Sequence, residues 1–524
     1  MEVRDNRIIL TIVEYEGMLI SINMMKSEIE VLKAEIRLLK NHPQKPNIKP
    51  SNLEGSTKKG TSQNTEKRAG SAKREKTKEL KIHKEEIIEA DGVQTDWKFK
   101  GYNDFVIQDI IVEARNTKFR LKKYITPEGK YVTATLPKEL EGVHFGTGLR
   151  QFILYQYYHC HVTEPLLLEQ LDEIGVHISA GELNNLLIEK KDIFHQEKEA
   201  ILTTGLAISS FIQTDDTGAR HNGKNGYCTV ICNDLFTYFK SGESKSRINF
   251  LELLRTPQHE DYQINSEALA YMEQQGLPDK YKRLIFSLPP QTYPDKLSFG
   301  KQLSDLEITA GYAVRVITEG ALIGSIIEHG VNKDIAILSD DAGQFNVFIH
   351  GLCWVHAERN IQKVHCFTEE QKSLLESKLD DFWKLYQELK CYKNKSTPLS
   401  KEELRSAFDD LFIKKTGFLS LDQALEKIEK NKQELLLVLE RPELPLHNNT
   451  SEGDVREYVK KRKISGSTRS DMGRKCRDTF ASLKKTCRKL HISFWEYLDD
   501  RIKKTQQIPF LPDLIITKHA VRYG

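Results

Sequence analysis

The sequence lacks three features that would define its class at once. It has no run of about 18 apolar residues, the length that a membrane-spanning helix requires. Its eight cysteines include no CxxC pair, which argues against a disulfide framework and a four-thiolate zinc site. The start MEVRDNRIILTIVEYEG has no long apolar segment followed by a small-residue cleavage site, so we expect no signal peptide. These absences predict a soluble, intracellular protein in a reducing compartment.

The chain has few apolar and many charged residues for its length. Of its 524 residues, 39% are hydrophobic and 29% are charged, so part of it is expected to be surface arm or linker. The length predicts roughly three or four folded units. The formal net charge of +3 conceals two basic stretches, one near the N-terminus and one between Lys460 and Lys489. This asymmetry favours a polyanionic partner.

The N-terminal region is predicted to be a helix followed by a flexible arm. Within residues 1–40, apolar residues spaced alternately three and four apart form a heptad seam: Ile22, Met25, Ile29, Leu32, Ile36 and Leu39. The seam predicts a coiled coil for oligomerisation, with an amphipathic helix packed on its own domain as the alternative. Residues 41–92 are rich in lysine, serine, threonine and proline and predict a basic flexible linker, whose lysines could add phosphate contacts.

The next two regions are predicted to be a small β unit and a helical unit. Residues 93–145 alternate apolar and polar residues around the turn at 127–129. Residues 146–205 contain two helix starts, at Thr163 before Pro165 and at Ser179 before Glu182, with Gly175 between them. Such a pair is compatible with a DNA-binding helix-turn-helix, although ordinary helix packing gives the same pattern.

The remaining residues, 206–524, are predicted to form a mixed α/β core that two insertions interrupt. Three strands are expected at 207–217, 226–234 and 236–241, then a helix at 247–254 and, later, a buried strand at 334–340. The core's first part would span 206–366, with an insertion at about 255–330 that contains a helix at 313–329. A helical insertion would fill 367–440, and the last part of the core would be 441–524.

Three acidic residues lie where an apolar element opens into a polar turn or helix start. Asp215 ends the first strand, Asp340 ends the later strand, and Glu452 falls in the first turn of a helix expected to be capped by Asn449 or Thr450. Carboxylates that converge at one end of a sheet repel one another unless cations neutralise them, and such oxygen ligands suit Mg²⁺ or Mn²⁺. Taken singly, each acid could equally be solvated or favoured by a helix dipole.

The sequence motifs around these acids resemble those of a known family. In order, QTDDTGARHNG, LSDDAGQFNVFIHGLCWVHAERN and NNTSEGDVREYVKKRKISGSTRS resemble the transposases of the insertion sequence 66 family, as does the upstream YQYYHCHVTEPLLLEQLDEIGVHIS. The resemblance implies an RNase H-like catalytic core with a DDE triad. It places the triad on Asp215, Asp340 and Glu452, and it implies that they hold two Mg²⁺ (or Mn²⁺) ions.

The match has informative details and departures. Cys353, Trp354 and His356 match the family's C-W-x-H word, for which we expect packing below the second Asp rather than contact with DNA or metal. Asp341 stands where the family has glycine, and Gly453 stands where it has arginine. Residues 93–140 contain no cysteine, whereas the family commonly has a zinc-binding cysteine segment before the core.

A basic helical stretch follows Glu452. Lysine and arginine side chains beside a metal-binding acid favour contact with DNA phosphates, although a charge run is also typical of a solvated face. The residues expected to bind DNA are Arg456 (which also matches a family arginine), Lys460, Lys461, Arg462, Lys463, Arg469 and Arg474. Lys475, Lys484, Lys485, Arg488 and Lys489 are expected to continue the positive surface.

Together these features predict a transposase that cleaves DNA at insertion-sequence ends and transfers the strands into target DNA. The partners would be double-stranded DNA and further copies of the chain, in a prokaryotic cytoplasm and without a membrane. A catalytically inactive or diverged DNA-binding protein of the same fold is one alternative. Another RNase H-like nuclease is the second.

Overall fold

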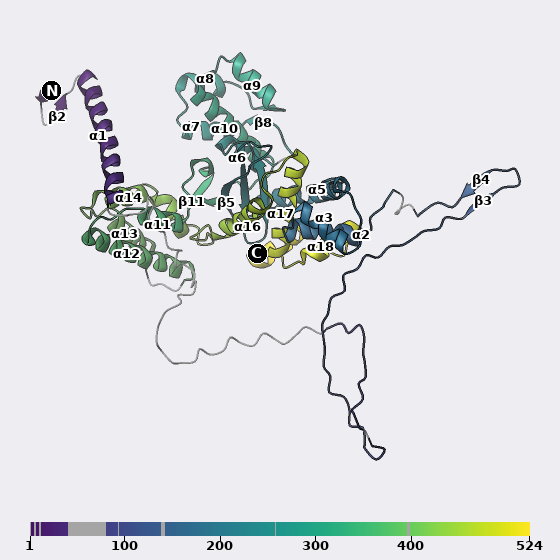
Figure 1. Ribbon diagram of the computed structural model, residues 1–524. Coiled ribbons are helices and arrows are strands. Elements are labelled where there is room, and N and C mark those ends of the chain that lie inside the picture. The colour runs from purple at the N-terminus through teal and green to yellow at the C-terminus, as the bar shows by residue number, and fades with distance from the viewer. Residues whose placement is uncertain are drawn as a thin grey trace. The chain divides into compact units, whose positions relative to one another are not determined.

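The computed structural model describes residues 2–4, 7–9, 12–39, 80–92, 94–137, 142–256, 258–395 and 399–523. The chain divides into two units, of which one is Ser51–Thr117 and the other combines Met1–Pro50 with Lys118–Gly524 (Figure 1). The second unit holds the helices and strands that the following paragraphs describe.

A five-stranded mixed sheet organises this unit. Its strand order is β11-β10-β5-β6-β7, and its strands are β5 (Phe211–Gly218), β6 (Tyr227–Cys232), β7 (Thr237–Gly242), β10 (Ala336–Ser339) and β11 (Ile349–Leu352). Strands β5, β6 and β7 are antiparallel neighbours, whereas β10 is parallel to both β5 and β11. The expected mixed α/β class is thus confirmed, and the four predicted strands form; β11 was not predicted.

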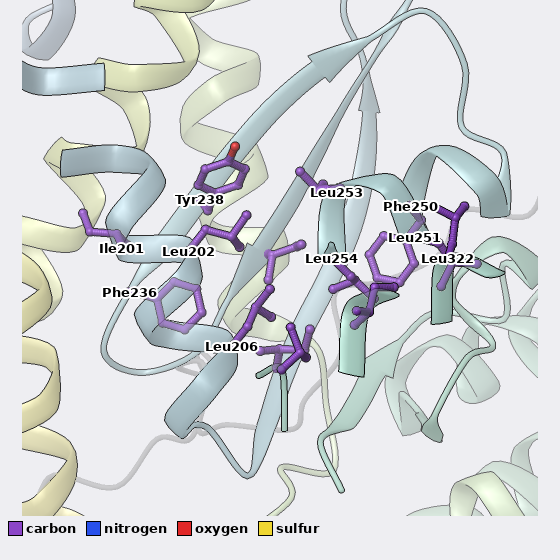
Figure 2. Packing of buried hydrophobic residues seen from close by; sticks show 14 of the residues in the cluster. Ile201, Leu202, Leu206, Phe236, Tyr238, Phe250, Leu251, Leu253, Leu254 and Leu322 are labelled. Atoms are coloured by element: carbon purple, nitrogen blue, oxygen red, sulfur yellow. The ribbon is translucent and has the colours of Figure 1, made fainter. Parts of the chain in front are cut away.

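Side chains along each strand point alternately to the two faces of the sheet. Different helices cover these two faces. One face packs on α5 (Asp192–Ile208), α6 (Arg247–Leu254) and α10 (Gly311–Glu328). Figure 2 shows Leu202 and Leu206 of α5 beside Phe236, with Tyr238 of β7 and the leucines of α6 close by. The other face, including Val230 and Phe239, packs on α16 (Asn449–Ser465) through Tyr458.

Helix α17 (Asp471–Lys489) covers the open edge at β7. The outward-pointing amides of Thr237, Phe239 and Ser241 donate to side chains of this helix, at 3.1 Å to Thr486 Oγ1, 2.8 Å to Ser482 Oγ and 2.7 Å to Asp478 Oδ2. An edge strand with unpaired amides would otherwise invite pairing with another chain. The polar residues of α17 therefore complete the sheet.

The stretch between β7 and β10 forms a small layer against α10. The hairpin of β8 (Tyr262–Ile264) and β9 (Gln291–Tyr293) is accompanied by α7 (Ser266–Gln274), α8 (Asp279–Phe286) and α9 (Lys296–Asp305). The backbone of β8 and the side chain of Asn265 leave space only for a glycine at Gly324 of α10. This close approach fixes the hairpin on the helix that leads into β10.

The predicted helical insertion is helical in the structure. It contains α12 (Glu369–Lys393), α13 (Lys401–Phe412), α14 (Leu419–Glu429) and α15 (Lys432–Leu435), after α11 (Trp354–Gln362). Trp354, the first residue of α11, is fully buried, and its ring contacts Phe382, Tyr386 and Phe408 of the insertion. One indole thus joins the insertion to the end of β11.

The helices upstream and at the C-terminus pack together beside α5. They are α2 (Thr147–Leu154), a π-helical turn at Tyr155–His159, α3 (Glu164–Glu173), α4 (Ala180–Ile188), α18 (Phe494–Lys503) and α19 (Leu511–Tyr523). Both predicted helix starts are present, with Ser179 Oγ accepting from the Glu182 amide at 3.2 Å. Gly175 has φ +81° in the turn between α3 and α4, a conformation that glycine adopts without strain.

The N-terminal predictions meet the structure only in part. Helix α1 (Ile12–Leu39) contains the heptad seam, and the described seam side chains, from Ile22 to Leu32, are exposed. A strand pair, β1 (Glu2–Arg4) and β2 (Arg7–Ile9), precedes it, and most of the predicted linker lies outside the described residues. The small β unit is less extensive than predicted: within the described residues 94–137 and 142–145, the strands are β3 (Lys123–Ile125) and β4 (Tyr131–Thr133), which form a hairpin. Both strands are exposed, and two strands without a third layer bury too little to extend further.

None of the helices in the described residues is long and apolar enough to cross a membrane.

Candidate active site at one edge of the sheet

Two of the predicted acids lie side by side on neighbouring parallel strands. The register pairs Leu338 of β10 with Gln213 of β5. Asp340 and Asp215 each come two residues after this pair, so both lie towards the C-terminal ends of these neighbouring strands. We call this end of the sheet the acidic edge. The Asp340 carboxylate also accepts the Ala342 amide at 3.1 Å, which closes the turn after β10.

The two adjacent aspartates of β5 point to opposite faces. Asp215 pairs with Val230, on the face that packs against α16, whereas Asp216 pairs with Thr229 on the other face. The Asp216 carboxylate accepts bonds from Thr229 Oγ1 at 2.5 Å and from Gln344 Nε2 at 2.9 Å. Asp215 therefore faces the helix that carries Glu452, and Asp216 is already satisfied by its neighbours.

The second pair of adjacent aspartates divides in the same way. Asp341 is bonded to the helical insertion, with Lys427 Nζ at 3.0 Å and Asn431 Nδ2 at 3.3 Å from its carboxylate. Asp340 has no such partner on the insertion among the bonds of the described residues. Asp341, which stands where the family has glycine, thus contacts the helical insertion.

Glu452 reaches this edge because the start of α16 is fixed to β5. Asn448 is completely buried, and its Nδ2 donates to the Thr214 carbonyl at 2.8 Å. The Ser451 amide donates to Gln213 Oε1 at 3.4 Å. The helix begins one or two residues earlier than predicted, and the residue that precedes it is Asn448 rather than Asn449 or Thr450. Its side chain makes no cap bond because it is used to hold the helix on the strand.

Asp340 and Glu452 both act electrostatically on Asp215. Burial is the largest cause that raises the pKa of Asp215, to about 7, and the charges of Asp340, Glu452 and Asp216 contribute to this rise. The Asp216 amide, which donates to Asp215 Oδ1 at 2.7 Å, opposes this shift. Asp215 is thus a carboxyl group whose charge the protein does not neutralise.

Glu452 is held by residues of α11. Arg359 forms a forked pair with it, with Nη1–Oε1 at 3.1 Å and Nη2–Oε2 at 3.4 Å. His356 Nε2 lies 3.8 Å from Glu452 Oε1, and burial lowers the pKa of this histidine. Within the described chain, Asp215, Asp340 and Glu452 do not form a group whose oxygens all lie within 4.8 Å of one another.

The expected packing role of two residues in the C-W-x-H word agrees with their positions. Cys353 is buried, and its Sγ accepts the Asn448 amide at 3.2 Å. Trp354 Nε1 donates to the Leu435 carbonyl at 2.9 Å. His356 differs because it lies against Glu452 and Arg359. Sequence analysis missed Arg359, although its position three residues after His356 on one helix was a usable signal.

The residues predicted to contact DNA do not share one environment. Lys461 is buried on α16, with Nζ bonded to the Tyr157 carbonyl at 2.8 Å and lying over the Tyr157 ring. Arg462 donates to the Gly218 carbonyl, and Arg474 pairs with Asp471 at 2.9 Å. The remaining residues of this set are exposed: Arg456, Lys460, Lys463 and Arg469.

The expected continuation of the positive surface is wrong for three lysines of α17. Lys484 is buried and lies 2.9 Å from Glu457, and Lys489 lies 2.7 Å from Asp454. Lys485 is half-buried and lies 3.1 Å from Asp454. These lysines neutralise acids of α16, whereas Lys475 and Arg488 are exposed as expected.

Comparison with known proteins identifies the family. Residues 338–475, which include Asp340 and Glu452, match the model described as Transposase IS66 family. The chain is also 43% identical over 304 residues to the uncharacterized protein y4jO of Sinorhizobium fredii (strain NBRC 101917 / NGR234), an alignment that covers 58% of this chain and 94% of that protein. The chain therefore belongs to the IS66 family of transposases.

Proposed function

We propose that this chain cleaves DNA at the ends of its insertion sequence and transfers the freed strands into target DNA. Asp215, Asp340 and Glu452 are the catalytic carboxylates of a DDE site on an RNase H-like core. The alternating strand geometry that turns Asp215, and not Asp216, towards α16 is the observation that carries the proposal.

The donor set suits two Mg²⁺ or Mn²⁺ ions. The charges of Asp340 and Glu452 contribute to the raised pKa of Asp215, so a hard cation shared by the three carboxylates would relieve this repulsion. Paired divalent ions activate a nucleophile and stabilise the leaving oxygen in phosphodiester chemistry. Glu452 has to exchange its bonds to Arg359 for the metal, while Asn448 keeps the helix start in place.

The DNA surface of the proposal consists of the exposed cations near the site. Arg456, Lys460, Lys463 and Arg469 are exposed on or just after α16 and would position DNA through its phosphates. Arg462 and Arg474 can join them by exchanging their present partners. Lys461 requires a rearrangement of α16 before it can do so, because it is buried.

Strand transfer requires two DNA ends to be brought together. The exposed seam of α1 offers a surface for pairing with further copies of the chain, and α3 and α4 offer a helix pair for DNA contact. The setting we propose is the prokaryotic cytoplasm, on DNA.

A second candidate is a DNA-binding protein of the same fold without turnover. The forked Arg359–Glu452 pair favours it, because this pair holds a catalytic acid away from a shared metal site. Gly453 in place of the family's arginine adds to that view.

The test uses DNA carrying the insertion-sequence ends and the full-length chain. With Mg²⁺, the wild type is expected to nick and join the ends, and Asp215→Asn or Glu452→Gln is expected to lower the rate by about a thousandfold or more. Asp216→Asn is the matched control, because Asp216 faces away from α16, and it should retain most activity. Full cleavage by Asp215→Asn would refute the proposed triad. Binding in EDTA without cleavage in Mg²⁺ or Mn²⁺ would select the second candidate.

A further inference from the structure

A second cluster of potential metal ligands lies away from the acidic edge. His259 and Asp261 come from the segment between α6 and β8, and His329 ends α10. One ligand atom from each residue lies within 4.8 Å of the others, and no other such group of three occurs among the described residues. We propose that these three residues bind a divalent transition-metal ion of the Zn²⁺ type, independently of the catalytic function proposed above.

The chemistry of the donors selects the class of metal. Two imidazole nitrogens with one carboxylate oxygen suit Zn²⁺ and related ions, whereas Mg²⁺ prefers oxygen ligands alone. Three protein ligands leave a fourth position for water in a tetrahedral site. This set therefore differs from the all-carboxylate edge in the ion that it favours.

The three residues are held together by a hydrogen bond and a ring stack, from which a metal site needs modest changes. His329 Nε2 lies 2.7 Å from Asp261 Oδ1, and the rings of His259 and His329 are stacked with centroids 3.5 Å apart and planes 8° apart. Ligand atoms bound about 2.0–2.1 Å from a tetrahedral ion lie roughly 3.3 Å from one another. The His329–Asp261 pair would open by about 0.6 Å on metal binding. The stacked rings also have to tilt so that both nitrogens face one ion, and His259 lies outside helices and strands.

Neighbouring residues hold the carboxylate in position. Gln263 Nε2 donates to Asp261 Oδ2 at 2.8 Å, which leaves Oδ1 towards His329. Arg255 Nη1 donates to the Asp261 carbonyl at 2.8 Å and fixes the backbone on which the ligand stands. Side chains that orient the metal-binding residues through hydrogen bonds in this way raise the affinity for the metal about 10–100-fold.

The position of the cluster gives the ion a structural role. It would join the start of β8 to the C-terminal end of α10, and the chain continues from α10 into β10 and Asp340. The sequence alone assigned no role to residues 255–330. A metal there would stabilise the layer that supports the second catalytic strand without touching the catalytic carboxylates.

The test measures Zn²⁺ binding to the full-length chain by competition with a chromophoric chelator, and Co²⁺ binding by visible absorption. The wild type is expected to hold one tightly bound ion with a nitrogen–oxygen spectrum and no sulfur-to-metal absorption, although the chain has eight cysteines. His259→Ala and His329→Ala should each weaken binding by more than about tenfold. Zn²⁺ should raise the melting temperature of the wild type but not of these variants.

Two controls separate this site from others. His177→Ala removes an exposed histidine that pairs with Asp172 at 2.9 Å and belongs to no three-residue ligand group, so it should bind Zn²⁺ as the wild type does. The double variant Asp215→Asn/Glu452→Gln should also keep the tight Zn²⁺ ion. Equal affinity of the wild type and His259→Ala, or loss of the ion in the double variant alone, would overturn the proposal. Melting temperatures that match in EDTA will show that the histidine variants fold.

Discussion

Acids of helix α16 belong to two groups with opposite fates. Glu452, in the first turn, joins Asp215 and Asp340 at the sheet edge, where burial and like charges raise the pKa of Asp215 to about 7. Five residues later, Glu457 meets Lys484 and His161, each at 2.9 Å. Burial alone would raise the pKa of Glu457, but these partners outweigh it and lower the pKa to about 2.

The difference teaches how to separate a metal-binding acid cluster from a structural one. Both groups are acidic, partly buried and next to basic sequence. The structural group receives its cations from α17, which packs against the same helix. Among the described residues, the group at the sheet edge has ion pairs only at Glu452, with Arg359 and His356, which suits the cation site that we propose there. The three predictions that follow test this contrast.

The largest effect is expected for the structural group. Glu457→Gln removes a charged partner of Lys484 and should lower the free energy of unfolding by about 2 kcal/mol near neutral pH. Because the folded pKa is lowered to about 2, this contribution is present above the unfolded value of about 4.3 and is lost as pH falls towards 2. Urea denaturation over a pH series measures it. Glu369→Gln, at an exposed pair with Lys372, is the control and should change stability little.

A smaller effect is expected where Arg359 competes with metal. Arg359→Gln frees Glu452 and removes a positive charge, so the affinity of the edge for Mn²⁺ should rise about tenfold, or roughly 1.4 kcal/mol. Electron paramagnetic resonance of free Mn²⁺ measures this binding. Arg315→Gln, at an exposed arginine near Glu319, should leave the affinity unchanged. Weaker Mn²⁺ binding by Arg359→Gln would show that the arginine supports the site instead.

The smallest effect has the opposite sign from the first. Asp215→Asn in EDTA should raise stability by about 1 kcal/mol near neutral pH, because it removes a charge that burial and neighbouring acids oppose. With the folded pKa raised to about 7, the gain is complete above pH 7 and disappears below the unfolded value of about 3.9. Asp216→Asn should raise stability less, since burial also raises the pKa of Asp216 but Thr229 and Gln344 donate to that carboxylate and oppose the shift. Equal effects of the two neighbours would contradict the contrast.

Local patterns in the sequence predicted what depends on local geometry. The helix expected at 247–254 is α6 (Arg247–Leu254), and the strand expected at 207–217 is β5 (Phe211–Gly218). Strand β11 was missed because it has four residues and no alternation. The lysines of α17 were misplaced because their acidic partners come from another helix, which a charge run does not reveal.

The candidate sites show the same limit. The order of the family's sequence motifs predicted which three acids form the site, but this order did not predict that Arg359 would bind Glu452. The His259–Asp261–His329 group was not predicted because His329 is far from the other two residues in the sequence and meets them only through the fold. An H-x-D word at the start of a strand was the one local hint.

The anchoring of α16 on β5 also has a consequence for synthesis. Asn448 Nδ2 and the Thr214 carbonyl are 234 residues apart in the chain, so β5 emerges from the ribosome long before its partner. At about 5–20 residues per second, the delay is roughly 10–50 s. During this time a nascent or prematurely ended chain has β5 but no Glu452. The three acids can therefore come together only after Glu452 has been synthesised.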